Sequence, residues 1–135
     1  MILIRGTTAP FKFKLPCANN ELGWVTIQFS QTNNPSKSLP IIKKLEDCGP
    51  RGINNELDGS QNLYVSLTAE ETTRFSDKYK ARMQMRAQQI GGVTFGCKLK
   101  LITVYPMDDD IIEEDPTMPE EGVDGWIILD GKNII

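Results

Sequence analysis

Two stretches of strict alternation between apolar and polar side chains constrain the fold of this chain more than any other feature. From Tyr79 to Gln88 the odd positions hold Tyr, Ala or Met, and the even positions hold Lys, Arg or Gln. After Ile90-Gly91-Gly92 the alternation resumes and runs from Val93 to Leu101. A period of two places successive side chains on opposite faces of a strand, whereas one face of a helix repeats every 3.6 residues. The pattern predicts two neighbouring β-strands, each with one buried face.

The loop between these strands has to keep both sets of apolar side chains on one face. Directly opposed residues of an antiparallel pair share a face, so odd positions must pair with odd positions across a loop of odd length. A three-residue loop, 90–92, with Gly92 at the positive-φ position of a bulge, meets this condition. We therefore expect residues 79–89 to pair antiparallel with residues 93–104, burying Met83, Met85, Phe95, Cys97 and Leu99. The apolar phase slips at Leu101-Ile102, which predicts a bulge before the strand ends.

Five further strands are predicted upstream, over residues 2–4, 11–15, 24–30, 39–45 and 63–67. Thr68 and Glu71 form a capping-box pattern, which predicts a short helix over residues 69–76. Seven strands, one helical turn between the fifth and sixth, and no long helix favour an all-β fold. The expected architecture is an immunoglobulin-like antiparallel β-sandwich with an extended acidic C-terminal arm. A small open barrel is the alternative.

Charge divides the chain into two parts. Residues 1–107 carry 14 basic and 8 acidic residues, a net charge of +6. Residues 108–135 carry 1 basic and 10 acidic residues, a net charge of −9. Carboxylates spaced along a stretch without periodicity repel one another and keep the backbone extended. We therefore predict a sandwich over residues 1–106 and an acidic extended arm over residues 107–135.

The arm ends in an apolar run that is costly to leave in water. It consists of Trp126, Ile127, Ile128 and Leu129. Burying side chains of this kind stabilises by about 1.5–3 kcal/mol each. The run is therefore predicted to bind a partner, either by entering an apolar groove or by adding a strand to an exposed sheet edge.

A second candidate for partner binding is the polar face of the predicted hairpin. Its basic residues are Lys80, Arg82, Arg86, Lys98 and Lys100. A solvated sheet face and neutralisation by an acidic segment, from the same chain or a neighbour, are both open interpretations. Nucleic acid is a third but weaker one, because single-strand sites interleave aromatic side chains for stacking and none lies on the polar face of this hairpin.

The composition argues against most enzymatic and metal chemistry. The chain has no histidine, which removes the commonest general base, metal ligand and activator of nucleophiles. Its three cysteines form no Cys-x-x-Cys pair, and we expect reduced thiols at core or boundary positions. The acids of 108–115 lack calcium-loop spacing, and nothing fixes two of them at the separation that glycoside hydrolysis needs. We expect no catalytic residue, no metal site and no cofactor.

Membrane insertion and export are not expected either. No apolar run reaches 18 residues, and the N-terminal sequence lacks the basic start and apolar stretch of a signal peptide.

Residues 2–16, ILIRGTTAPFKFKLP, resemble the start of small proteins encoded in phages and prophages of Firmicutes, which carry an IRGTTP-x-F-x-F-x-LP pattern. Residues 65–72, VSLTAEET, look like their LTQEET segment, and residues 83–86, MQMR, like the VQIR strand that follows. The resemblance covers about residues 1–105, with Ala9 in place of Thr or Pro and a longer loop over residues 49–62. Residues 124–131 are similar to the acidic, Trp-bearing end of some members.

More distantly, the layout is similar to the immunoglobulin-like N-terminal domains of phage baseplate proteins. The resemblance implies a virion or virion-assembly protein without known catalytic residues. We therefore expect a phage structural protein of the head, neck or tail, assembled in the host bacterial cytoplasm and located in the virion. Its expected partners are major capsid, neck or tail subunits and copies of itself. The alternative is a non-virion phage protein that binds a host or regulatory partner.

Overall fold

The computed structural model describes residues 1–106 and 127–128. The chain is mostly β-sheet, which confirms the all-β class. The strands are β1 (Ile2–Ile4), β2 (Ala9–Lys14), β3 (Leu22–Gln31), β4 (Ile41–Lys44), β5 (Asn62–Leu67), β6 (Ala81–Gln89), β7 (Thr94–Gly96), β8 (Lys100–Tyr105) and β9 (Ile127–Ile128). One α-helix, α1 (Ala69–Thr72), lies between β5 and β6, and two 3-10 turns, η1 (Asn19–Glu21) and η2 (Leu45–Asp47), flank β3 and β4.

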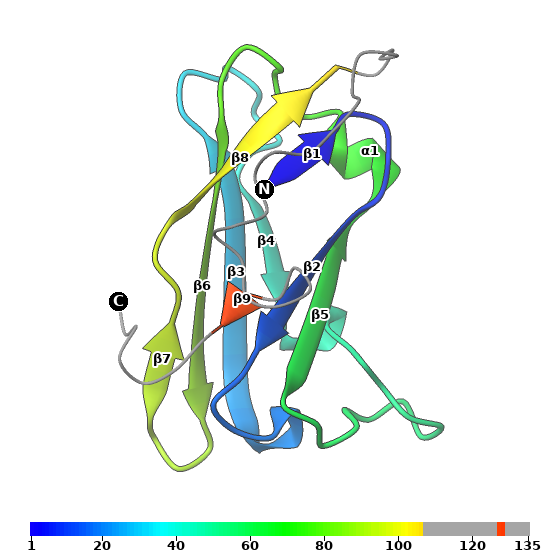
Figure 1. The fold of residues 1–135 in the computed structure, drawn as a ribbon, viewed down its shortest axis with the longest axis vertical. Helices are drawn as coiled ribbons and strands as arrows, with labels where there is room; N and C mark the ends of the chain where they lie inside the picture. Colours follow the sequence, from blue (N-terminus) through cyan, green and yellow to red (C-terminus); the bar gives the residue numbers. More distant parts are fainter. Residues whose placement is uncertain (107–126, 129–135) are drawn as a thin grey trace.

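These strands form two sheets. The larger sheet has the order β1-β8-β6-β3-β4, with β7 also paired to β6, and the smaller one has the order β5-β2-β9. Most strands run along the long axis of the molecule, and β9 lies beside β2 (Figure 1). Neighbours are antiparallel except for two parallel pairs, β1 with β8 and β2 with β9. Both exceptions to the predicted antiparallel arrangement join strands far apart in sequence, where no tight turn sets the direction.

The hairpin of β6 and β7 confirms the predicted register. Ala87 pairs with Phe95, and residues 90–92 form the loop, with Gly92 at φ +101°. The amide of Gln89 donates to the carbonyl of Val93, and the amide of Gly92 donates to the carbonyl of Gln89. Odd positions therefore pair with odd positions.

The prediction for Leu99 is wrong. Arg86 pairs with Gly96, but Met83, three residues earlier, pairs with Lys100, four residues later. One extra residue thus enters the second strand between β7 and β8, so every later side chain changes face. Leu99 is 41% exposed, whereas Ile102 is fully buried. The predicted phase slip exists, but it occurs before Leu99 and not at Leu101.

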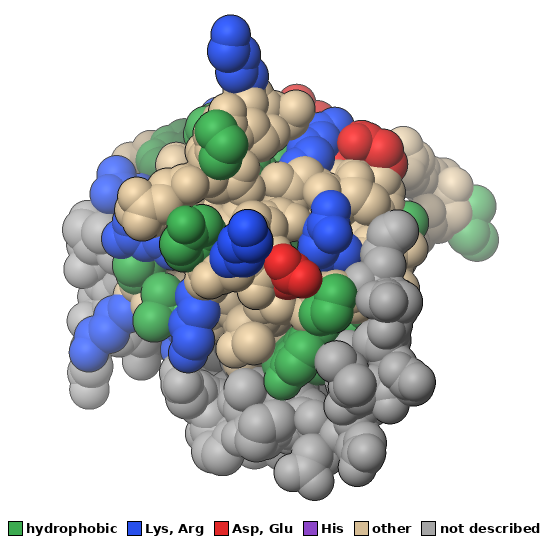
Figure 2. Space-filling view, turned by 90° about the horizontal axis from the view of Figure 1, so that it is seen from above, with side chains coloured by type: hydrophobic (Ala, Val, Ile, Leu, Met, Phe, Trp, Pro, Cys, Tyr) green, Lys and Arg blue, Asp and Glu red, His purple; other side chains and the backbone are tan. Residues whose placement is uncertain are grey.

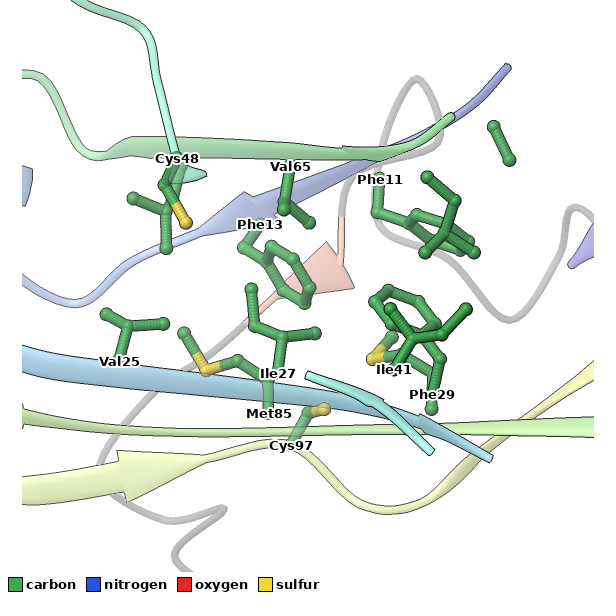
Figure 3. Packing of buried hydrophobic residues seen from close by; sticks show 14 of the residues in the cluster. Phe11, Phe13, Val25, Ile27, Phe29, Ile41, Cys48, Val65, Met85 and Cys97 are labelled. Carbon is green, nitrogen blue, oxygen red and sulfur yellow. The ribbon is translucent and has the colours of Figure 1, made fainter. Parts of the chain in front are cut away.

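The inner faces of the two sheets enclose one apolar core. Side chains of β2 and β5, among them Phe11, Phe13 and Val65, approach those of β3 and β6 (Figure 3). The rings of Phe11 and Phe29 lie with centroids 4.9 Å apart. The predicted hairpin residues Met83, Met85, Phe95 and Cys97 all belong to this core.

The capping box of α1 is confirmed, although the helix is shorter than predicted. Thr68 Oγ1 accepts from the amide of Glu71 at 3.1 Å, and Glu71 Oε1 accepts from the amide of Thr68 at 2.8 Å. The same carboxylate binds Lys43 Nζ at 2.9 Å, which ties α1 to β4. Burial alone would raise the pKa of Glu71, but the bonds from Lys43 and Thr68 outweigh it and lower the pKa.

We expect Glu71→Gln to destabilise the protein at pH 7 by about 1 kcal/mol, because it removes the ion pair with Lys43 and the charge that strengthens the hydrogen bond from the Thr68 amide. The pKa of Glu71 is lower in the folded state than in the unfolded one. Its contribution is therefore complete above the unfolded pKa and disappears as the pH falls through the folded pKa. The difference between variant and wild type should thus narrow between pH 7 and pH 3 in urea unfolding. Glu70→Gln on the exposed side of α1 is the control; an equal loss there would contradict the assignment.

The buried side-chain amides of Asn19 and Gln31 connect segments that no local sequence pattern joins. Asn19 Nδ2 donates to Asp58 Oδ1 and to the carbonyl of Asn62, each at 2.9 Å, and Asn19 Oδ1 accepts from the amide of Gly59 at 2.8 Å. Hydrogen bonds from Ser60 have the largest effect in lowering the pKa of Asp58, and the hydrogen bond from Asn19 lowers it further. At the other end of β3, Gln31 binds the backbone of residues 76 and 79. Both amides fix the ends of β3 against chain segments about 40 residues later in the sequence.

Candidate functional site

The alternating strands of the larger sheet direct one set of side chains away from the core. We call this set the outer face. Its members alternate with buried residues along β3, β4, β6 and β8. They are Trp24, Thr26, Gln28, Ser30, Ile42, Lys44, Arg82, Gln84, Arg86, Gln88, Leu101 and Thr103.

The outer face is basic and carries no carboxylate among these residues. The sheet register places Thr26 between Lys44 and Arg86, and Arg82 between Ser30 and Leu101. Both ion pairs found among the described residues, Lys43–Glu71 and Arg74–Glu70, lie elsewhere. Lys44, Arg82 and Arg86 therefore have no carboxylate partner in the part of the chain that the structure describes.

The five predicted basic residues do not all share this face. Arg82 and Arg86 lie on it and are exposed. Lys80 is exposed just before β6, at the end of the molecule that carries α1, where Lys and Arg side chains are prominent (Figure 2). Lys98 is exposed in the connection between β7 and β8. Lys100 pairs with the inward-facing Met83 because of the register shift, so it takes an inward position at the start of β8.

Trp24 is a member of this face that the sequence analysis passed over. It stands at an even position of β3 together with Thr26 and Gln28, so the alternation alone could have placed it outward. Its indole Nε1 donates to Gln88 Oε1 at 2.8 Å, and Gln88 Nε2 donates to the carbonyl of Gly92 at 3.2 Å. The indole is thus fixed by the hairpin loop while its ring stays 41% exposed.

A groove adjoins Trp24 at this end of the outer face. It has a volume of about 290 Å³ and is lined by residues 23–26 of β3 and by Lys44, Leu45 and Glu46. Lys44 Nζ donates to Thr26 Oγ1 at 3.3 Å across its floor. An aromatic ring, a cation and hydroxyl and carboxylate groups therefore meet in one concave surface.

The second candidate region is the edge of β2 that carries β9, which we call the β2 edge. Ile127 pairs with Phe13 and Ile128 pairs with Lys14, in parallel. Two of the four predicted apolar binding residues are thus placed in a strand on the smaller sheet. Trp126 and Leu129 lie outside the described residues.

The predicted metal and cysteine chemistry can be checked over the described residues. No group of three or more His, Cys, Asp or Glu side chains within them could hold a metal ion. The acidic candidates at 108–115 lie outside the described residues. All three cysteines are buried and free of disulfide bonds. Burial has the largest effect on the Cys48 thiol and the nearby Asp47 carboxylate adds to it, and together they raise its pKa to about 12. The thiol is therefore not ionised at neutral pH.

We expect native Cys48 to resist alkylation. Iodoacetamide reacts with thiolates, and this thiol is 3% exposed with a strongly raised pKa. Mass spectrometry after treatment at pH 8 should find Cys48 modified more than 100-fold more slowly than in urea-unfolded protein. Rapid modification of the folded protein would show that the loop around η2 opens.

Comparison with protein-family models and with curated proteins finds no match for this sequence. In the part of the chain that the structure describes, no helix is long and apolar enough to cross a membrane. The outer face and the β2 edge are the two candidate binding surfaces of the described residues.

Proposed function

We propose that this chain is a bacteriophage virion structural protein, an auxiliary component of the head, neck or tail. It occupies a repeated site on the particle through its β-stranded body and its C-terminal arm. The observation that carries the proposal is the pairing of β9 with β2, because a segment 20 residues beyond the body adds a strand to a sheet edge. The resemblance of residues 1–105 to small phage proteins supports the same function.

The body of this protein is proposed to be an immunoglobulin-like β-sandwich. Two sheets that face each other across one core, and α1 at the crossover between β5 and β6, support this architecture. Two sheets packed on one core suit a subunit that is repeated many times on a particle. A rigid body presents the same surfaces in every copy.

In the structure β9 adds to β2 of its own chain, and the same addition to the β2 edge of a neighbouring copy is the proposed way in which the arm contributes to binding. Main-chain hydrogen bonds along a sheet edge give affinity, and the alternate side chains give specificity. Trp126 immediately precedes the paired residues, and tryptophan is among the strongest anchors at protein interfaces. Residues 108–124 contain nine acidic residues and no basic one, so this segment favours partners with basic surfaces. Capsid, neck or tail subunits and other copies of this chain are the proposed partners.

The other class of function, a non-virion protein that binds a host or regulatory partner, uses the same surfaces. Mass spectrometry of purified particles separates the two. We expect many copies per particle. Absence of the chain from particles that contain all other structural proteins would contradict the virion proposal and favour the regulatory one.

We expect the arm to determine incorporation. When full-length protein competes at physiological salt with a chain ending after Tyr105, the shortened chain should enter particles at least 10-fold less well. Trp126→Ala should reproduce most of that loss because it removes the proposed anchor. Ile135→Ala, a change of an apolar residue in the same arm outside the residues proposed to bind, is the control. Equal incorporation of all four proteins would show that the arm is dispensable.

A further inference from the structure

We propose that the outer face is a docking surface for an acidic polypeptide segment, and that this segment is residues 108–124 of a second copy of the chain. The inference rests on the proposed function, which brings copies of the protein next to one another. It adds the partner, the surface that receives it and a residue, Trp24, that anchors it.

Charge is the first argument. Lys44 points outward from β4, and Arg82 and Arg86 point outward from β6, with β3 between these two strands. No aspartate or glutamate is among the residues that define the outer face, although Glu46 lines the groove next to Lys44. Surfaces of soluble proteins usually intersperse the two signs of charge, so a sheet face with only one sign attracts an oppositely charged partner. These three side chains also lack carboxylate partners within the described part of the chain.

Apolar exposure is the second argument. Trp24 is 41%, Ile42 is 46% and Leu101 is 52% exposed, and all three belong to the outer face. Aromatic side chains and arginine are enriched at protein interfaces, whereas aspartate and glutamate are depleted. The outer face has this composition. A partner for it must therefore combine carboxylates with apolar side chains.

The third argument is that Trp24 is fixed before any partner arrives. Its only polar atom, Nε1, is already bonded to Gln88, and Gln88 is bonded to the hairpin loop. What remains available is the ring itself, above the groove that Lys44 and Thr26 line. Because little side-chain freedom is lost on binding, a fixed ring costs less conformational entropy than a mobile one.

Residues 108–124 have the required chemistry. They contain nine carboxylates and no base, together with Ile111, Ile112, Met118 and Val123. At about 3.3 Å per residue their extended length is roughly 55 Å, enough to cross a whole sheet.

A second copy is favoured as the donor of this segment. In the same chain, β9 follows this segment and is paired with β2 in the smaller sheet, and the outer face of the larger sheet points away from the smaller one. The chain's own segment would have to reach the outer face and then return to β2. A segment from a neighbour has no such restriction.

Nucleic acid fits this surface less well. Single-strand sites follow a groove with several stacking aromatics, and Trp24 is the one aromatic residue in the set that defines the outer face. Ile42 and Leu101 have no counterpart to contact on a sugar-phosphate backbone. An acidic polypeptide with aliphatic side chains satisfies both kinds of group.

The test is binding of a fluorescein-labelled synthetic peptide of residues 108–124 to the purified full-length protein, measured by anisotropy. We expect a Kd of about 10–100 μM at low salt, weakened at least 10-fold when salt rises from about 0.05 to 0.5 M. The double variant Arg82→Glu, Arg86→Glu should weaken binding at least 10-fold, and Trp24→Ala about 10-fold. The matched control is Lys37→Glu, Lys78→Glu, which makes the same change in net charge at exposed loop positions outside the outer face. It should bind within 2-fold of the wild type.

Each other outcome overturns a defined part of the proposal. Equal weakening by the two double variants would show that only net charge matters and that the outer face is no site. If the peptide binds only after all nine acids of the protein's own segment are changed to Asn or Gln, the occupant is the chain's own segment. Tighter binding of an oligothymidine of similar charge, lost with Trp24→Ala, would assign the face to nucleic acid. The peptide-binding measurement uses purified protein and does not depend on particle assembly. Loss of peptide binding would therefore contradict the docking surface without contradicting the virion proposal, and absence from particles would contradict the virion proposal without contradicting the docking surface.

Discussion

Replacing Met85 by aspartate is expected to unfold the protein at 25 °C. Met85 is fully buried at the centre of the larger sheet, where it pairs with Ile27 of β3. An isolated carboxylate there is either desolvated or held protonated, and either state costs several kcal/mol in addition to the lost packing of the methionine. Since whole domains are stable by only about 5–15 kcal/mol, this single change removes most of the folding free energy.

The measurement is the thermal midpoint by circular dichroism, with Gln84→Asp as control. Gln84 is the neighbouring residue of β6 and lies on the outer face, so a carboxylate there stays in contact with water. We expect its midpoint to change by only a few degrees. A Met85→Asp variant that kept the wild-type midpoint would mean that the register of β6 is wrong by one residue.

Replacing Asn19 by leucine is expected to destabilise the protein by about 3–4 kcal/mol. Leucine has a similar size, but it leaves the amide of Gly59 and the carbonyl of Asn62 without the partners that Asn19 supplies. Each unsatisfied buried polar group costs about 1–3 kcal/mol. Asn20→Leu, one residue later and exposed, is the control and should cost less than about 1 kcal/mol.

Urea unfolding followed by fluorescence measures both free energies. If the two variants are equally stable, then the fully buried Asn19 does not hold the 58–62 loop, and the side-chain bonds contribute nothing net. If Asn19→Leu unfolds with a reduced m-value, the loop is already open in its native state.

The hairpin was predictable because its information is local. The alternation around Met83 and Phe95 sets which residues face the core, and parity then fixes a three-residue loop with Gly92 at the bulge. The capping box of Thr68 and Glu71 is local in the same sense, since each residue satisfies the other's backbone within one turn. Patterns of this length need no knowledge of the rest of the molecule.

The register shift between β7 and β8 could not be placed as well. The sequence from Cys97 to Leu101 alternates without interruption, so nothing in it marks where the extra residue enters. The strand pairing of β8 decides where the extra residue enters. β8 pairs with β6 and, in parallel, with β1, and this pairing turns the side chains of Ile102 and Val104 inward. Leu99 and Leu101 are left outside as a consequence.

The candidate site was predictable only in part. The alternation of β6 identified Arg82 and Arg86 as outward residues, but it could not show which strands lie beside them. Only the pairing of β3 with β6 places Trp24 and Thr26 next to Gln88 and Arg86. The hydrogen bonds of the buried Asn19 escaped prediction for the same reason, because its partners lie in a loop about 40 residues later in the sequence.

The parallel pairing of β1 with β8 also has a consequence for synthesis. Residues 2–4 pair with residues 103–105, so β1 leaves the ribosome about 100 residues before its partner strand β8. At about 5–20 residues per second, the roughly 100 intervening residues take on the order of 5–20 s to emerge. Throughout that time Leu3, which is 1% exposed in the folded protein, lacks its pairing partner Val104. This edge of the sheet therefore forms only after β8 has been translated, in a slow step dominated by long-range loop closure. Just before this step the unpaired strand of the nascent chain is exposed to binding by chaperones and to cleavage by proteases.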